Sequence, residues 1–524
     1  MNDVVTERAV ADRRWRNIFL LQAAAATALV LVVTDRDALT TSKVQFLLLN
    51  LGLVYYLLWE TWRLVRRAET RPWLHPAALA SYAHFILGYF IPNLRYLTDV
   101  DWVWMPGGHV RADDTLFASL NRTMLFVILA AFAMWRGYKS QFSVAVGERI
   151  ASVLKTRGWV KEHLDVRFGV AGAFFVASIV AWVIQIQLGV FAYNSDQDLL
   201  AKTLAIRNWL ETATDGAKLV LLVLALCAFS ERYRNNVTVW WLFIALLVWQ
   251  TLLGFLSGFK SQVIAPAVTA ALAYYVMKGR TPLRWLVVTG VLLFFAYAVV
   301  QPFRELRYSS RDFDGRSLRS IAGTAVVAAT TQDGGEEGQP FFDALLGRQD
   351  VTTPTSVAIS FKDERGVPPG SPEFLEDLWM SPLNAYIPRF AWPTKRKTHL
   401  GVWFNVEVLG APATAYTAVA MGPVGYFNFA GGIPMVIIGF LLFGFLQRVT
   451  YDALISNGAG GALMFLVLLA PLVMLPDDVA SMLAGFLRML PVVMFAQILL
   501  LRPSREGHNE FAALATSPER GRSA

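Results

Sequence analysis

The sequence predicts an all-α, polytopic integral membrane protein with about twelve transmembrane helices and one large outer loop. Three observations lead to this prediction. Of the 524 residues, 55% are hydrophobic and only 16% are charged, whereas soluble domains carry about 25% charged residues. The mean hydropathy is +0.44. The apolar residues form long runs joined by short basic connections, and a long polar segment interrupts them late in the chain.

The composition also excludes several classes of site. The net charge of +8 would elsewhere suggest a nucleic-acid partner, but here the excess lies in short connections between apolar runs, so no nucleic acid is expected. A single cysteine, Cys227, excludes an intramolecular disulfide and a cysteine metal cluster. The six histidines show no HxxxH or HExxH spacing, so we expect neither a metal nor a cofactor.

Twelve apolar runs approach the length that crosses the ~30 Å apolar thickness of a membrane. The first follows a basic N-terminus and lacks a convincing cleavage site, so it is predicted to be a membrane helix rather than a signal peptide. The last two also fit a single re-entrant hairpin. The runs are residues 18–33, 44–62, 76–92, 116–135, 168–191, 217–230, 237–256, 263–277, 285–301, 424–446, 462–475 and 479–501.

Basic residues predict the orientation of these runs. Lysine and arginine cluster after the second, fourth, sixth and eighth runs, on the side of the basic N-terminus. Short cytoplasmic connections carry such an excess, so both termini are predicted to be cytoplasmic, in a bacterial inner membrane. The outer connections are then residues 34–43, 93–114, 192–216 and 257–262, together with the long segment after residue 301.

The chain therefore divides into four parts. Residues 1–301 form an N-terminal transmembrane bundle, residues 302–422 a large periplasmic loop, residues 423–501 the C-terminal transmembrane helices and residues 502–524 a disordered cytoplasmic tail. Within the loop, the stretches at 333–338 and 368–372 are expected to be flexible. The apolar pieces at 341–346 and 374–379 are expected to form short helices at the membrane surface.

A basic and aromatic segment, residues 386–401, lies late in this loop. Its cations suit a phosphate or diphosphate, and arginine offers a planar fork that binds phosphoryl oxygens through two hydrogen bonds. Pro388 and Pro393 favour a shaped loop over a continuous helix. The alternative interpretation is a solvated basic loop. The side chains that define the segment are Tyr386, Arg389, Trp392, Lys395, Arg396, Lys397 and His399.

Two further basic groups are predicted at the same outer face. Arg304 and Arg307 follow the ninth run and share a face if its helix continues. Such a pair fits a diphosphate, or alternatively snorkels to lipid phosphates. Lys260 lies in the turn at 257–262, so short that the lysine is expected at the membrane surface or within the bundle, where desolvation strengthens its attraction for an anion. Alternatively, it only lets two helices turn.

The candidate proton acceptors are four. Asp477 and Asp478 are adjacent carboxylates that repel each other, which favours one of them as a base, although a solvated turn is the alternative. His399 lies among cations that keep it neutral and able to accept a proton. Glu407 is the fourth candidate.

Two ionisable side chains lie inside apolar runs. Arg488 is costly in lipid, so it is expected to face the bundle interior or a polar cavity, with an acid as its potential partner. His84 is expected to be a helix-packing residue rather than a catalyst.

Three stretches resemble the O-antigen polymerase family, the oligosaccharide repeat-unit polymerases of bacterial polysaccharide assembly. Residues 387–395, Ile-Pro-Arg-Phe-Ala-Trp-Pro-Thr-Lys, are similar to the family's Pro-Arg-x-x-Trp-Pro-x-Lys segment. The glycine-containing segment 421–432 resembles the one that leads back into the membrane. The turn Ser257-Gly258-Phe259-Lys260 is similar to the family's small-Gly-x-basic turn. The motifs cover a small part of the chain, and the aspartate pair and the stretch at 333–338 do not map onto the family.

The resemblance implies a membrane glycosyltransferase that polymerises polyprenyl-diphosphate-linked oligosaccharides into a surface polysaccharide or exopolysaccharide. Its partners would be that lipid-linked substrate, membrane lipid, and a chain-length regulator and flippase of the same pathway. The substrate-binding residues would be Arg389, Arg304, Arg307, Lys260, Lys395, Trp392 and Tyr386, and the candidate bases are His399, Glu407, Asp477 and Asp478.

Three alternatives share some of these features. An O-antigen ligase-like transferase needs the same diphosphate contacts and differs in its acceptor. A transporter of lipid-linked glycans is expected to show matched halves and broken helices, and the sequence shows no matched halves. A membrane scaffold would use the basic loop to bind a protein.

Overall fold

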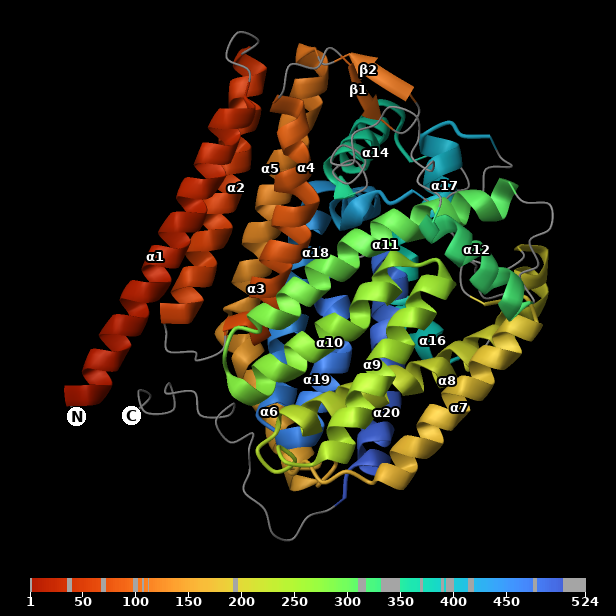
Figure 1. Ribbon diagram of the computed structural model, residues 1–524. Helices are drawn as coiled ribbons and strands as arrows, with labels where there is room; N and C mark the ends of the chain where they lie inside the picture. Colours follow the sequence, from red (N-terminus) through yellow and green to blue (C-terminus); the bar gives the residue numbers. More distant parts are fainter. Residues whose placement is uncertain are drawn as a thin grey trace.

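The computed structural model describes residues 2–34, 40–66, 72–97, 102–105, 108–111, 113–191, 197–309, 317–330, 349–367, 371–387, 391–392, 400–412, 419–474 and 478–502. This part of the chain is a helical bundle with one short antiparallel hairpin, β1 (Trp102–Met105) and β2 (Gly108–Arg111), in which Trp102 pairs with Arg111 (Figure 1). Seven of the described helices are long and apolar enough to cross a membrane. The prediction of a multi-pass α-helical membrane protein is therefore confirmed.

All twelve predicted runs fall on helices, and the exact number of spans stays a prediction. The third run is composite: α3 (Pro76–Ala80), a π-helix η2 (Ser81–Phe90) and α4 (Ile91–Asn93), followed by the 3-10 turn η3 (Leu94–Leu97). The other runs lie on α1 (Asn2–Val33), α2 (Thr41–Arg66), α5 (Asp114–Tyr138), α7 (Phe168–Gln187), α8 (Gln197–Phe229), α9 (Val237–Ser257), α10 (Lys260–Lys278), α11 (Leu283–Ser309), α18 (Gly422–Ile455), α19 (Gly458–Val473) and α20 (Val479–Leu500).

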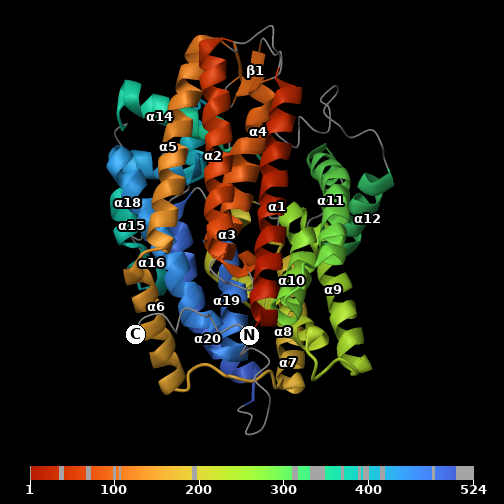
Figure 2. The same cartoon turned by 90° about the vertical axis from the view of Figure 1, so that its left-hand side faces the viewer.

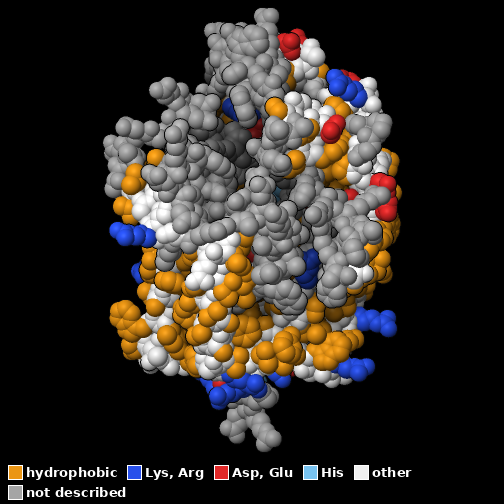
Figure 3. Space-filling view, turned by 90° about the vertical axis from the view of Figure 1, so that its right-hand side faces the viewer, with side chains coloured by type: hydrophobic (Ala, Val, Ile, Leu, Met, Phe, Trp, Pro, Cys, Tyr) orange, Lys and Arg blue, Asp and Glu red, His pale blue; other side chains and the backbone are white. Residues whose placement is uncertain are grey.

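The connections predicted to be cytoplasmic lie together at one end of the bundle, the lower end in Figures 1 and 2. Lys139, after α5, forms an ion pair with Glu60 of α2. Arg232, after α8, pairs with Asp165 (3.5 Å), and Lys278 at the end of α10 pairs with Glu231. In Figure 3, hydrophobic side chains cover much of the lower half of the visible face, and Lys and Arg gather at its bottom edge. This grouping agrees with the predicted alternation of the connections.

Two helices cross closely in the centre of the bundle. A Cβ on Gly444 of α18 would lie 1.9 Å from the carbonyl oxygen of Met134 in α5, and a Cβ on Gly137 would lie 2.0 Å from that of Leu441. Only a residue without a side chain permits this approach of two backbones, as is common where membrane helices pack. The contact fixes α18 along α5.

Several helical segments of the structure were not predicted, and the three longest are described first. The connection at 192–216, which was predicted to be an outer one, is largely helical, because α8 begins at Gln197. It packs on α7, where Ser178 donates to the carbonyl of Ala213 (2.7 Å). An amphipathic helix α6 (Gln141–Thr156) follows α5. The third segment, α14 (Thr352–Arg365), lies within the predicted large loop.

The predicted loop thus contains ordered elements rather than surface pieces alone. Its described helices are α12 (Leu318–Thr330), α14, α15 (Phe374–Trp379), α16 (Ser381–Tyr386), α17 (Leu400–Trp403) and the π-turn η5 (Phe404–Val408). The predicted short helix at 374–379 is confirmed as α15. The predicted features at 333–338, 341–346 and 503–524 lie outside the described residues.

Candidate functional site

The helix α14 is a polar helix with a buried first turn, and it joins the outer segment to the bundle. Its Thr352, Thr353, Thr355 and Ser356 are at most 1% exposed. The helix starts where Asp350 accepts a hydrogen bond from the backbone of Thr353 (3.1 Å), as capping residues do, and it ends at Gly366. The hydroxyls of Thr353, Thr355 and Ser356 bond to neighbouring segments, whereas that of Thr352 has no hydrogen-bond partner among the described residues. Three of the four buried side chains therefore hold α14 in the bundle.

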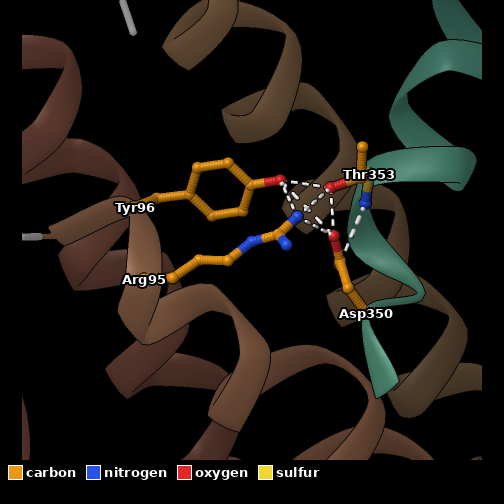
Figure 4. Close-up of polar contacts among 4 residues, drawn as sticks. All are labelled: Arg95, Tyr96, Asp350 and Thr353. Carbon is orange, nitrogen blue, oxygen red and sulfur yellow. Dashed lines mark hydrogen bonds and ion pairs between the residues drawn. The ribbon is translucent and has the colours of Figure 1, made fainter. Parts of the chain in front are cut away.

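A buried ionic cluster holds the start of α14. Asp350, whose side chain is 2% exposed, forms an ion pair with Arg95 of η3. Tyr96 and Thr353 complete the cluster, and Arg95 donates to the hydroxyls of Tyr96 (2.8 Å) and Thr353 (2.9 Å) (Figure 4). Burial is the largest single effect and opposes the charge of Arg95, but Asp350 and Tyr96 together outweigh it and raise the pKa of Arg95. The guanidinium therefore stays charged, and the cluster ties the end of the third run to α14.

The rest of α14 is held from two sides. The hydroxyl of Ser119 in α5 lies 2.7 Å from those of Ser356 and Ser360. The carbonyl of Gly88, in the π-helix, accepts a hydrogen bond from the backbone of Val351 (3.0 Å). Thr355 donates to the carbonyl of Met421, next to the start of α18 (2.9 Å). These bonds satisfy the buried hydroxyls of Thr355 and Ser356, as is usual for buried polar groups.

The last turns of α14 reach a break in α18. The backbone leaves the helical conformation at Gly431 and Gly432, and Gly432 adopts a φ of 72°, which favours glycine. Lys362 donates to the carbonyl of Asn428, one of those left without an intrahelical partner by the break. Burial lowers the pKa of Lys362, against the opposing effect of Asp363. A cation thus caps the first half of the broken helix.

The predicted basic segment is held at both ends, while most of it lies outside the described residues. At its start, the hydroxyl of Tyr386 in α16 donates to the carbonyl of Leu487 in α20 (2.7 Å), and the Tyr386 side chain is 55% exposed. At its end, Leu400 of α17 is buried, and the carbonyl of Gly401 accepts a hydrogen bond from the backbone of Val419 (3.1 Å). Trp392 is half-buried. Arg389, Lys395, Arg396, Lys397 and His399 lie outside the described residues.

The start of α20 gives Asp478 a structural contact. Its carboxylate accepts hydrogen bonds from the backbone and the hydroxyl of Ser481 (2.9 and 2.6 Å), as the N-cap of the helix. The carboxylate that was predicted as a candidate base thus has a structural role as a helix cap, and its role as a base stays a prediction. Its neighbour Asp477 lies outside the described residues, and Glu407 is exposed on η5.

Arg488 does not face the bundle interior, which was the first of the two surroundings predicted for it. It is an exposed residue, and its Nε lies 3.4 Å from the carbonyl of Ala385 in α16. Because α16 packs along α20, the arginine finds a backbone carbonyl at the helix surface instead of an acid in the core. His84 is buried among the rings of Phe85 and Tyr89, as expected of a packing residue.

Two of the predicted basic groups lie near each other, at the end of the bundle that is predicted to be outer. The predicted continuation of the ninth run is present, because α11 extends to Ser309 and carries Arg304 and Arg307 on its last turns. The side chains of these two arginines are not described. Phe303 and Leu306 beside them pack in one small cluster with Leu256, close to the turn that leads into Lys260. Lys260 begins α10, with its ammonium group enclosed.

A groove of about 460 Å³ opens between α19 and α20. Asp478 and Ser481 line it at the start of α20, and the remaining lining is apolar. The residues of α20 that line the groove lie on a different face of the helix from Leu487 and Arg488, which contact α16. Its apolar lining consists of Val467, Leu468, Pro471, Met482, Gly485, Phe486 and Met489.

Sequence reasoning missed the residues that hold α14, namely Arg95, Tyr96, Asp350, Thr353 and Lys362. They come from two segments that are about 250 residues apart in the sequence, and they belong to no motif. Only the contacts in the structure therefore reveal them. The one sequence feature that could have indicated the cluster is the charged side chain of Arg95 just after an apolar run. Among the described residues, no group of three or more His, Cys, Asp and Glu side chains is arranged to hold a metal ion.

Comparisons of this chain with protein-family models, with curated proteins and with solved structures returned no match.

Proposed function

We propose that this chain is a polymerase of polyprenyl-diphosphate-linked oligosaccharide repeat units, acting at the outer face of the bacterial inner membrane and related to the O-antigen polymerases. The observation that carries the proposal is the anchoring of the basic segment. Its Tyr386 end is bonded to α20, whose N-terminal half lines an apolar groove. Its other end, at Leu400, is buried in the core cluster that also contains Ala358 and Ile359 of α14. A lipid-linked sugar needs an apolar surface for its chain and cations for its diphosphate.

The chemistry requires little more than these groups. The hydroxyl of one repeat unit attacks the anomeric carbon of the growing glycan, and the bond from that carbon to the polyprenyl diphosphate breaks. The leaving diphosphate is already a stable anion, so it requires cations more than a proton. Arg389, Lys395 and the pair on α11 are the proposed source of this charge.

The attacking hydroxyl must lose its proton to a base. With the carboxylate of Asp478 bonded to Ser481, the favoured candidates are His399, Glu407 and Asp477. Sugar rings would stack on the exposed face of Tyr386 and on Trp392, while the transition state at the anomeric carbon resembles an oxocarbenium ion.

The test is the length of glycan in cells that carry Arg389→Ala. Losing one cation aimed at developing charge typically costs a factor of about 10²–10³ in rate, so long polysaccharide should collapse to single repeat units. The matched control is Arg319→Ala, which removes an exposed cation of the same outer segment from α12. The abundance of each variant in the membrane is measured alongside. Unchanged glycan in both Arg389→Ala and deletion strains would contradict the proposal.

One observation favours a second candidate, a transporter of lipid-linked glycans. Discontinuous membrane helices often form the substrate sites of transporters, and α18 is interrupted at Gly431 and Gly432. The deletion strain separates the two functions. Repeat units that accumulate at the outer leaflet without growing indicate a lost polymerase, whereas units that never reach the outer leaflet indicate a lost transporter. A ligase instead leaves long glycan on the polyprenyl carrier.

A further inference from the structure

The helix α6 presents three faces of different chemistry. Successive residues of a helix lie about 100° apart, which places Ser143, Gly147 and Leu154 on one face. This face packs on α18, where a Cβ on Gly147 would lie 2.7 Å from the Cβ of Asp452. A second face is polar and carries Glu148, the one acid of α6, together with Ser152 and Lys155.

The third face of α6 combines exposed apolar side chains with arginines. Phe142 is 70% exposed and Val153 is 47% exposed, and Ile150 and Val146 lie between them. Arg149 lies within this stripe, and Arg157 follows at its end. Neither arginine forms an ion pair with a residue that the structure describes. We call this face, residues 142, 146, 149, 150, 153 and 157, the α6 stripe.

The α6 stripe continues the lipid-facing surface of the bundle. On α5, exposed Leu125, Leu129 and Phe132 lead to Arg136, whose guanidinium lies 4.8 Å from the centre of the Phe132 ring. Beyond them, Phe142 stacks on Phe445 of α18 (5.6 Å between ring centres). In Figures 1 and 2, α6 lies below α5 at the end where the basic connections gather. An apolar surface that becomes basic at one end matches the change from acyl chains to headgroups.

From this continuity and the charge of the stripe, we propose that α6 lies in the headgroup region of one leaflet and that Arg149 and Arg157 bind anionic lipid. Helices with an apolar face bordered by cations lie in membrane interfaces and favour anionic headgroups. The acid of α6 is kept on the polar face, so nothing on the stripe repels a negative headgroup. The proposal is independent of the proposed function.

The position of α6 is tested with spin labels at two adjacent residues. Val153→Cys and Ser152→Cys are made separately in the full chain with Cys227→Ala, and each protein is reconstituted into vesicles of phosphatidylcholine and phosphatidylglycerol. The label at position 153 should collide with oxygen more than with a water-soluble nickel complex, and the label at 152 should do the reverse. Equal nickel accessibility at both positions would overturn the proposal.

The lipid preference is tested by titrating the purified full-length protein in detergent with phosphatidylglycerol or phosphatidylcholine and following its thermal unfolding. Phosphatidylglycerol should stabilise the protein more than phosphatidylcholine. Arg149→Gln should weaken the apparent affinity for phosphatidylglycerol about fivefold, as expected for one cation near a membrane surface. The matched control Lys155→Gln removes a cation from the polar face and should change it little.

Two outcomes would refute the anionic-lipid site. An equal loss in both variants would mean that only the total charge matters, and no loss in either would mean that the stripe does not bind the headgroup. A disulfide between two copies of Val146→Cys in native membranes, formed irrespective of lipid composition, would assign the stripe to a second copy of the chain.

Discussion

The buried ion pair of Arg95 and Asp350 shows most clearly how two side chains decide the position of a whole helix, α14. Breaking a buried, hydrogen-bonded ion pair by removing one partner leaves a charge without compensation and typically costs about 3–5 kcal/mol. We therefore predict that Asp350→Asn or Arg95→Met lowers the free energy of unfolding in mixed detergent micelles by about 3 kcal/mol. The double variant should cost less than the sum of the two.

The chain offers a matched control in the same helix. Arg122 pairs with Asp363 at 2.5 Å, but the two side chains are 50% and 37% exposed. Solvent screens such a pair, so Asp363→Asn should change the unfolding free energy by only about 0–1 kcal/mol. If both aspartate variants have the same small effect, the cluster of Figure 4 does not anchor α14.

Individual residues were also the least predictable part of the molecule. The sequence indicated basic groups for a diphosphate, and the structure brings the turn before Lys260 to the end of α11. Asp478 was predicted as a proton acceptor, yet its carboxylate caps α20. A capping role depends on where a helix begins, and the apolar pattern locates helix ends only within a few residues. Of the two surroundings predicted for Arg488, the bundle interior was wrong, because α16, packed along α20, supplies a carbonyl at the helix surface.

The contact between α5 and α18 is decided by two glycines. A methyl group at Gly137 or Gly444 would overlap a backbone carbonyl of the facing helix, which cannot move as a flexible side chain does. Gly444→Ala should therefore force the helices apart and cost at least about 1–3 kcal/mol. By contrast, Gly172→Ala in α7 meets no atom within 4 Å, and it should stabilise the protein by up to about 1 kcal/mol through helix propensity.

Thermal unfolding of the two purified variants checks this difference directly. An equal response would show that α5 and α18 can separate without cost.

The same two helices explain which elements were predictable. Long apolar runs such as those of α5 and α18 identify themselves in the sequence. The helices α6 and α14 do not, because α14 buries hydroxyls that only its neighbours satisfy and α6 spreads its apolar residues over one narrow face.

At the level of the whole molecule, the alternation of basic and non-basic connections predicted which connections lie at the same end of the bundle. Connections that were assigned to one side contact one another or a neighbouring helix end, as with Glu231 and Lys278, or Lys139 and Glu60 near the end of α2. On the other side, Arg95 after the third run meets Asp350 of the outer segment. These contacts group the connections into two sets. Charge alone assigns one set to the cytoplasm, through the preference of lysine and arginine for that side.

This assignment predicts which cysteines a membrane-impermeant maleimide reaches in intact cells. The single native Cys227 is fully buried, so a Cys227→Ala background carrying one new cysteine reports on one site. Asp363→Cys, on the exposed end of α14, should react from outside. Arg280→Cys, exposed between α10 and α11, should react only after the inner membrane is permeabilised. The reverse result would place the basic connections outside, and the cations of the outer segment could then no longer meet a substrate that is polymerised at the outer leaflet.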